Sequence, residues 1–276
     1  MSRSGVPVST VLDEAAELVR ALPGWAGLLA LASFPLRFAE AHFVNRLAQL
    51  GAEATEYMNH LTAISWVITF ALLPALWGRA VFARACSLAL SGGGLGRMPT
   101  RQVLRLSPAG FLSYVWVALV CEALFFAVGW TVIALPLLAL LIGLAAATSS
   151  LQERPGLLAS LLVVLRHARP LGTLLGLAIV FVIALPVAFL NLSVLFWFLL
   201  WLAGGTTGLD LSWWQVALTW NNRQFVLLVL AGALSLVEPF WIAALVATVR
   251  RARAQQSGED LRAWFAALRA EDEEAA

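Results

Sequence analysis

The stretch "SLVEPFWIAALVATVRRARAQQSGEDLRAWF", residues 235–265, begins as an apolar helix and ends as a polar one. An arginine-rich segment, residues 250–253, separates the two parts. Arginines directly after an apolar span mark the cytoplasmic side of a bilayer. Within the apolar part, Glu238 stands directly before Pro239. The stretch therefore predicts a final membrane-spanning helix with one ionisable group inside it.

The composition of the whole chain agrees with a membrane location. Of the 276 residues, 61% are hydrophobic and 12% are charged, and the mean hydropathy is +0.85. Soluble domains carry about 25% charged residues. The basic residues flank apolar segments instead of clustering on one face, which argues against nucleic-acid binding. These features predict an all-α fold, a polytopic transmembrane helix bundle.

Apolar segments long enough to cross a bilayer recur along the chain. The block 108–148 alone would be about 60 Å long as a helix, so it must fold back, near Gly129. The helix of the second span is expected to continue to Ser91. Asn221 and Asn222 precede the last span and can cap its helix. We predict six spans within one domain of residues 1–256, at about 22–44, 61–78, 108–128, 130–148, 171–190 and 224–249.

The fifth apolar region, residues 171–203, allows two topologies. As a helix it would measure about 50 Å, which is long for one simple crossing. Two crossings would place the carboxy-terminal arginines outside the cell, against the positive-inside rule. We therefore favour one crossing that kinks at Pro186 and continues along the outer surface to Ala203.

Arginine placement orients the bundle. The arginines that we assign to cytoplasmic loop regions form three groups: Arg79, Arg84, Arg97, Arg101 and Arg105; Arg154, Arg166 and Arg169; and Arg250, Arg251 and Arg253. By the positive-inside rule, six spans then place both termini in the cytoplasm. The sequence thus predicts a multi-pass membrane protein.

Two cytoplasmic segments have amphipathic patterns: residues 153–170 and the tail, residues 257–276. In the tail, Ser257 and Asp260 resemble a capping box. The apolar stripe that follows consists of Leu261, Trp264, Phe265 and Leu268. The tail ends in acidic residues, which disfavours binding to anionic lipid. Two alternatives remain: docking onto the protein's own loops, or docking a soluble protein partner.

Six stretches, at residues 12–23, 33–43, 76–92, 187–204, 220–225 and 238–265, carry a resemblance to known proteins. The clearest is the last, "EPFWIAALVATVRRARAQQSGEDLRAWF", in which an acidic residue and a proline are followed by a helix, a basic segment and Ser-Gly-Glu-Asp-Leu. In this order the stretches resemble an uncharacterised family of bacterial multi-span integral membrane proteins, which implies a protein of the bacterial inner membrane. The resemblance implies a multi-span fold without an established activity. It also implies genes near those for MoxR-type AAA ATPases and transglutaminase-like membrane proteins. Arg37 and Glu40 depart from the more uniformly apolar pattern of the family, and residues 247–256 are more basic. The resemblance supplies no active-site residues.

No motif predicts an enzyme. The three histidines do not form a metal-binding helix, and the glycine-rich segment 91–96 lacks the Gly-Lys-Ser/Thr of a phosphate loop. Cys86 and Cys121 are too few for a disulfide framework and lack zinc-site spacing. We therefore predict no catalytic residues, no metal and no cofactor.

The remaining candidates are ionisable residues inside the predicted spans. Glu122 and Glu238 lie at similar depth, and an unpaired charge there costs about 2.5–3.5 kcal/mol. The best partner for either is Arg37, whose span crosses at overlapping depth. One interpretation is that these charges hold the bundle together; the other is transport or proton relay.

These observations favour a non-enzymatic structural or assembly component of a membrane complex. Its expected partners are the lipid bilayer and a protein bound through the tail. The alternative is a small permease or channel-like subunit that uses Arg37, Glu122 and Glu238. Transporters often contain internal repeats, and no convincing repeat is visible in this sequence.

Overall fold

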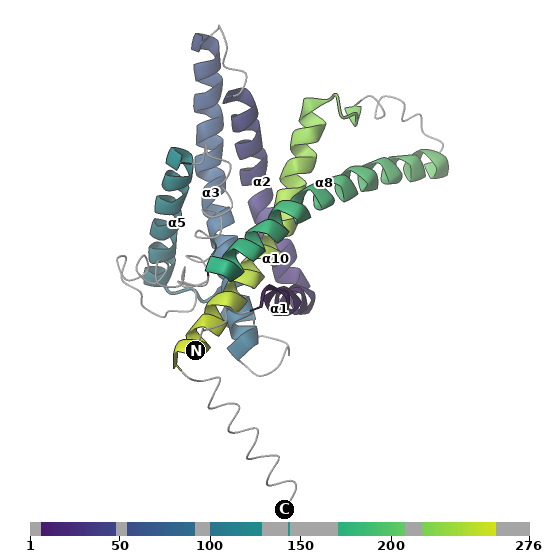
Figure 1. The fold of residues 1–276 in the computed structure, drawn as a ribbon. Helices are drawn as coiled ribbons and strands as arrows, with labels where there is room; N and C mark the ends of the chain where they lie inside the picture. The colour runs from purple at the N-terminus through teal and green to yellow at the C-terminus, as the bar shows by residue number, and fades with distance from the viewer. Residues whose placement is uncertain are drawn as a thin grey trace, which may run out of the picture.

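The computed structural model describes residues 7–47, 54–91, 100–128, 143, 171–207 and 217–257. Every element in these ranges is a helix: α1 (Val8–Ala21), α2 (Pro23–Leu47), α3 (Ala54–Ser91), α4 (Thr100–Leu104), α5 (Pro108–Val128), α8 (Leu171–Thr207) and α10 (Arg223–Ser257). Figure 1 shows their arrangement. The all-α prediction is confirmed for the described part of the chain.

α1 lies almost perpendicular to the helix that follows it. The chain bends by 94° between Val8–Ala21 and Pro23–Arg46. Pro23 is the first residue of α2, a position that tolerates proline because its missing N–H has no partner there anyway. The apolar side of α1, formed by Val11, Ala15 and Leu18, is buried against the bundle. The sequence did not lead us to predict this transverse helix.

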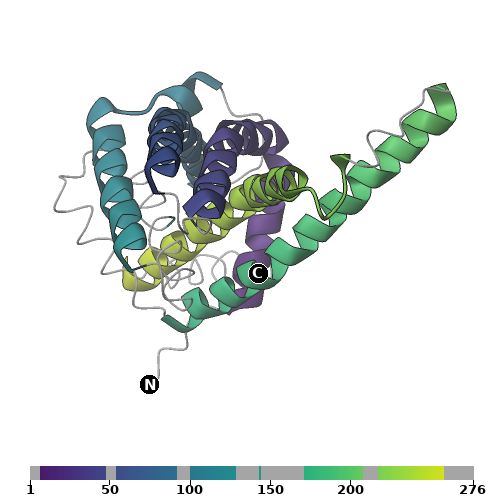
Figure 2. The same cartoon turned by 90° about the horizontal axis from the view of Figure 1, so that it is seen from above.

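α2 and α3 lie side by side along most of their length (Figures 1 and 2). Small residues permit this close approach. A Cβ atom added at Gly78 would lie 3.1 Å from Cβ of Ala32 on α2. Small residues are common where membrane helices pack, since tight van der Waals contact replaces the hydrophobic effect there.

α10 is the central helix and contacts α1, α2, α3 and α8. Residues 241–249 of α10 are all buried. The helix begins after Asn222, whose Oδ1 accepts a hydrogen bond from the Gln224 backbone N–H at 3.1 Å. This N-cap was predicted from the sequence.

α8 lies at the edge of the bundle. It packs against α10 and touches α1. Contacts with α10 extend into its second half, where the ring centroid of Phe196 lies 6.1 Å from that of Phe225. Its carboxy-terminal end projects away from the other described helices (Figures 1 and 2). Much of its apolar surface is exposed, for example Ile179 at 61% and Val194 at 66%. The helix is continuous through Pro186, so the fifth apolar region forms one helix and not two crossings.

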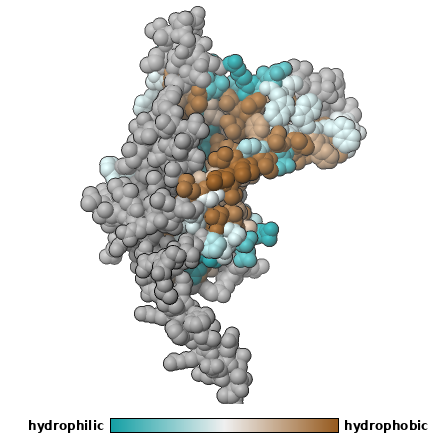
Figure 3. All heavy atoms as spheres, in the orientation of Figure 1, coloured by the Kyte–Doolittle hydropathy of each residue, from teal (hydrophilic) through white to brown (hydrophobic). Residues whose placement is uncertain are grey.

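Three described helical segments are long and apolar enough to cross a membrane: Asn59–Leu90, Thr173–Thr207 and Arg223–Arg251. The bent pair formed by α1 and α2 makes a fourth if it is one span. The face in Figure 3 carries a hydrophobic band with hydrophilic residues above and below it. This distribution is that of a membrane protein.

The helices extend beyond the predicted spans. α3 continues past residue 78 to Ser91, as the sequence predicted, and α10 continues past residue 249 through the arginines to Ser257. Ser257, the predicted start of the tail helix, is part of α10, and the rest of the tail lies outside the described residues. The predicted span 130–148 and the amphipathic segment 153–170 lie outside the described residues, apart from Gly143.

Candidate functional site

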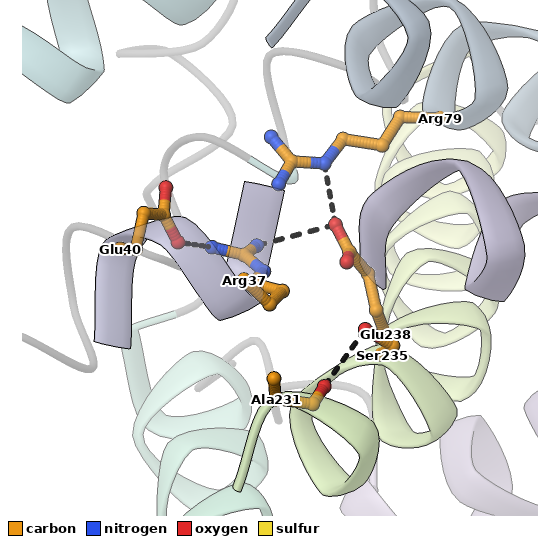
Figure 4. A network of polar contacts seen from close by, with 6 residues as sticks. All are labelled: Arg37, Glu40, Arg79, Ala231, Ser235 and Glu238. Atoms are coloured by element: carbon orange, nitrogen blue, oxygen red, sulfur yellow. Dashed lines mark hydrogen bonds and ion pairs between the residues drawn. The ribbon is translucent and has the colours of Figure 1, made fainter. Parts of the chain in front are cut away.

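Glu238 lies in the centre of the bundle, on α10. Its residue is only 5% exposed, so the carboxylate is withdrawn from both water and lipid. Pro239 follows it and cannot donate a hydrogen bond to the Ser235 carbonyl. The Ser235 hydroxyl donates instead to the Ala231 carbonyl, at 2.8 Å (Figure 4). The Ser235 hydroxyl is therefore bonded within α10, and the partners of the Glu238 carboxylate lie on other helices.

The first partner of Glu238 is Arg79, on α3. Its Nε donates to Oε1 of Glu238 in a short ion pair. The Arg79 side chain is 2% exposed, which makes it one of the largest fully buried side chains in the described part of the molecule. A charge buried this completely requires an opposite charge in contact, and Glu238 provides it.

The second partner is Arg37, on α2. Its Nη2 lies 3.3 Å from the same Oε1 of Glu238, and its Nη1 donates to Oε2 of Glu40 at 2.8 Å. Arg37 and Glu40 are three residues apart on one helix, which places their side chains on the same face. Arg37 thus bridges two carboxylates, as Figure 4 shows. We refer to Arg37, Glu40, Arg79 and Glu238 together as the charge cluster.

The charge cluster pairs groups of opposite charge. Its two arginines and two glutamates carry formal charges that sum to zero, and positive and negative groups alternate from Glu40 through Arg37 and Glu238 to Arg79. The cluster joins three helices that are far apart in the sequence. Opposite charges in contact remove much of the cost of an isolated intramembrane charge, about 2.5–3.5 kcal/mol each.

Distances along the helices place the charge cluster deep in the bundle. Glu238 precedes Arg251 by 13 residues, about 20 Å along α10. Arg37 follows Pro23 by 14 residues, about 21 Å along α2. Both reference residues lie at the level of α1, where Arg251 Nε contacts Glu14 Oε2 at 2.7 Å. The charge cluster therefore lies about 20 Å along the bundle from α1, inside helices that are long enough to cross a hydrocarbon core of about 30 Å.

The two halves of the charge cluster differ in exposure. The side chains of Arg37 and Glu40 are 23% and 22% exposed, whereas those of Arg79 and Glu238 are 2% and 6% exposed. Both guanidinium groups contact Oε1 of Glu238. The buried Oε2 makes no hydrogen bond to the residues that the structure describes. Arg79 and Glu238 therefore form the buried side of the charge cluster, and Arg37 and Glu40 form its partly exposed side.

The sequence predicted part of this site. It paired Arg37 with Glu238 or Glu122, and the structure contains the pair with Glu238. Glu122 lies in α5, which packs against α3, and its side chain is outside the described part of the chain. The tail residues Leu261, Trp264, Phe265 and Leu268 are also outside it.

Arg79 was placed wrongly from the sequence. We assigned it to a cytoplasmic loop region, whereas it lies within α3, 12 residues before the end of the helix. The sequence signal was the small and apolar run on both sides of Arg79, residues 75–83, which has helical spacing.

Among the described residues, no group of three or more histidine, cysteine or acidic side chains could hold a metal ion. The chemistry of the charge cluster is thus that of ion pairing between helices. Comparisons with protein-family models, with curated proteins and with solved structures gave no match to this chain.

Proposed function

We propose that this chain is a six-span protein of the bacterial inner membrane and a non-enzymatic structural or assembly component of a membrane complex. The observation that carries the proposal is the ion pairing within the charge cluster. Each of its four charged groups contacts a group of opposite sign within the protein. Ion pairs that join α2, α3 and α10 in this way hold helices together.

Both termini face the cytoplasm in this proposal. The Glu14–Arg251 pair supports it, because it brings the first and last described helices to the same end of the bundle. Exposed arginines occur toward that end in α1, in α4, directly after α4 and in α10: Arg20, Arg101, Arg105 and Arg250. By the positive-inside rule, this end is cytoplasmic.

The partner of the complex binds through the tail, residues 257–276, in this proposal. The test is purification in native detergent of the full-length chain and of a chain that ends at residue 256. Recovery of one protein in fixed stoichiometry with the full-length chain alone supports the proposal. Recovery of a monomer or homo-oligomer from both preparations contradicts it.

A second candidate function, transport, is favoured by two observations. Oε2 of Glu238 has no hydrogen-bond partner in the described ranges, and Arg37 and Glu40 are each about a fifth exposed. Polar groups within a membrane often line ion or proton pathways. Proteoliposomes distinguish the two functions: transport requires faster collapse of an imposed pH gradient with the wild-type chain than with Glu238→Gln. Equal rates exclude a proton pathway through Glu238.

A further inference from the structure

Three arginines lie near the contact between α3 and α4. Arg84 is on α3, Arg101 is on α4 and Arg105 directly follows α4. Arg101 and Arg105 are exposed, and Arg84 is partly exposed. Among the described residues, no carboxylate forms an ion pair with any of the three. We refer to Arg84, Arg101 and Arg105 as the basic patch, since they place three positive charges at one surface.

A hydrogen bond from Arg84 closes the carboxy-terminal end of α4. In a longer helix, the Gln102 carbonyl would accept a hydrogen bond from the N–H of residue 106. The Leu106 N–H bonds to the Leu104 carbonyl instead, at 2.8 Å, and Nε of Arg84 donates to the Gln102 carbonyl, at 3.0 Å. The Arg84 guanidinium therefore takes the place of that N–H, beside the backbone of Arg105. Its two Nη groups remain as hydrogen-bond donors.

The short helix α4 has a buried side and an exposed side. Val103 is completely buried in the hydrophobic core, which anchors α4 to the bundle. Arg101 and Arg105 are four residues apart, about one helical turn. Leu104, which precedes Arg105, is an apolar side chain that is 42% exposed. The exposed side of α4 thus combines positive charge with apolar surface.

The basic patch lies at the edge of the apolar part of the bundle. Arg84 is six residues, about 9 Å, before Leu90, where the membrane-spanning candidate Asn59–Leu90 ends. The apolar helix α5 begins at Pro108, three residues after Arg105. Lipid headgroups lie directly outside the hydrocarbon core of a bilayer. The three guanidinium groups are therefore at the level where headgroups are expected.

We propose that the basic patch binds the headgroup of an anionic phospholipid. The lipid phosphate accepts hydrogen bonds from the guanidinium groups, and Leu104 contacts an acyl chain. Guanidinium groups pair strongly with phosphate oxygens, and basic groups at a membrane surface attract anionic lipid. Leu104 favours a lipid over free phosphate, because free phosphate has no apolar part to cover it. The inference requires only that the bundle lies in a membrane, so it does not depend on the proposed function.

The test is thermal unfolding of the full-length chain in dodecyl maltoside. Dioleoylphosphatidylglycerol, dioleoylphosphatidylcholine or sodium phosphate is added in increasing amounts, because a ligand that binds the folded state raises the unfolding temperature. The concentration that gives half of the maximal rise measures the affinity. The main variant is Arg101→Gln/Arg105→Gln. Arg84 is left unchanged, because its hydrogen bond to Gln102 holds α4 in place.

Three further chains serve as comparisons. Arg20→Gln/Arg250→Gln is the matched control, because it also removes two exposed arginines from the end of the bundle marked by α1. Leu104→Ser removes the exposed apolar side chain. A chain that ends at residue 256 lacks the acidic tail, which is the other candidate for covering the basic patch.

We expect the unaltered chain to bind phosphatidylglycerol at least roughly tenfold more tightly than phosphatidylcholine, and Arg101→Gln/Arg105→Gln to lose about tenfold in affinity for phosphatidylglycerol alone. The Arg20→Gln/Arg250→Gln control should stay within about twofold, because the attraction comes from arginines near the bound headgroup. Leu104→Ser should weaken both lipids by about threefold, since apolar contact is lost. Without added lipid, all variants should unfold at the temperature of the unaltered chain, because the substituted residues are exposed.

Equal affinity for the two lipids would overturn the proposal, as would an unchanged affinity for phosphatidylglycerol in Arg101→Gln/Arg105→Gln. An equal loss in the Arg20→Gln/Arg250→Gln control would mean that the total charge of this end attracts the lipid. A rise with sodium phosphate as large as that with phosphatidylglycerol would identify a site for a free anion. Binding of phosphatidylglycerol by the shortened chain only would show that the tail covers the basic patch. Each of these results contradicts the lipid site, and none of them bears on a protein partner.

Discussion

Glu14 on α1 and Arg251 on α10 form an ion pair, with Arg251 Nε 2.7 Å from Glu14 Oε2. The two residues are 237 positions apart in the sequence. Their contact fixes the transverse helix α1 across the end of the central helix. It also marks one end of the bundle. The positions of other residues along the helices can be expressed as distances from this end.

The first prediction concerns the strength of this pair. The Arg251 and Glu14 side chains are 36% and 20% exposed, so water screens their attraction. A double-mutant cycle with Glu14→Gln and Arg251→Gln should give a coupling energy of about 0.2–1 kcal/mol. Thermal unfolding in detergent measures it.

Asp13→Asn is the matched control for Glu14→Gln, because Asp13 is exposed on the solvent side of the same helix. Its combination with Arg251→Gln should be additive. A coupling at Asp13 equal to that at Glu14 would show that the general charge of α1 is responsible and not the observed contact.

The second prediction concerns Gly78, which precedes Arg79. A methyl group at this position would lie 3.1 Å from Cβ of Ala32 and 3.5 Å from Cδ1 of Leu29. Gly78→Leu should therefore force α2 and α3 apart and destabilise the protein by about 1–3 kcal/mol. Because Arg37 and Arg79 lie on the separated helices, the charge cluster should also be disturbed. The measurement is again thermal unfolding in detergent.

Gly27 provides the control for Gly78, since an added Cβ atom there meets nothing within 4 Å. Gly27→Leu changes the helix propensity in the same direction without the clash. Equal destabilisation at both positions would mean that the α2–α3 contact does not require a small residue at Gly78.

The core of the site could be predicted from the sequence because intramembrane charges need partners. Arg37 and Glu238 are surrounded by apolar residues in spans of overlapping depth, and this alone favoured their pairing. Arg79 presented a different problem. An arginine that follows an apolar run is typical of a cytoplasmic loop. The sequence predicted that the helix continues to Ser91, but only the packing of α3 against α2 and α10 shows that Arg79 is buried inside the bundle.

The transverse direction of α1 could not be predicted for a similar reason. Its sequence, Val8–Ala21, contains acidic residues and one apolar stripe, a pattern that fits many surface helices. The 94° bend follows from the fit of Val11, Ala15 and Leu18 into the end of the bundle. That fit depends on residues of α8 and α10, more than 150 positions later in the chain.

The third prediction concerns the N-cap of α10. The Asn222 side chain accepts a hydrogen bond from the Gln224 N–H at 3.1 Å and donates one to the Ala217 carbonyl at 2.6 Å. Asn222→Ala removes both and should lower the free energy of unfolding by about 0.5–2 kcal/mol. Asn222→Asp keeps the acceptor and should recover part of the loss. Asn221→Ala, at the exposed neighbouring position, should have little effect, and an equal loss at Asn221 would contradict the capping role.

The fourth prediction tests whether the exposed side of α8 faces lipid. Ile183 is 60% exposed and lies two residues after Phe181, whose ring centroid is 4.8 Å from that of Trp241. Trp241 is within one turn of Glu238, so Ile183 lies at nearly the depth of the charge cluster. Ile183→Arg should then cost about 2.5–3.5 kcal/mol on insertion. The measurement is the fraction of protein that remains in the membrane after carbonate extraction.

Thr206→Arg is the control for Ile183→Arg, because Thr206 is also exposed on α8 but lies one residue from the end of the helix. At a membrane surface, arginine extends its charged group into the headgroup region at little cost. We therefore expect Thr206→Arg to remain integrated at the wild-type level. If Ile183→Arg also remains integrated, water or a polar partner covers this side of α8, and the apolar band is not a lipid-facing surface at that depth.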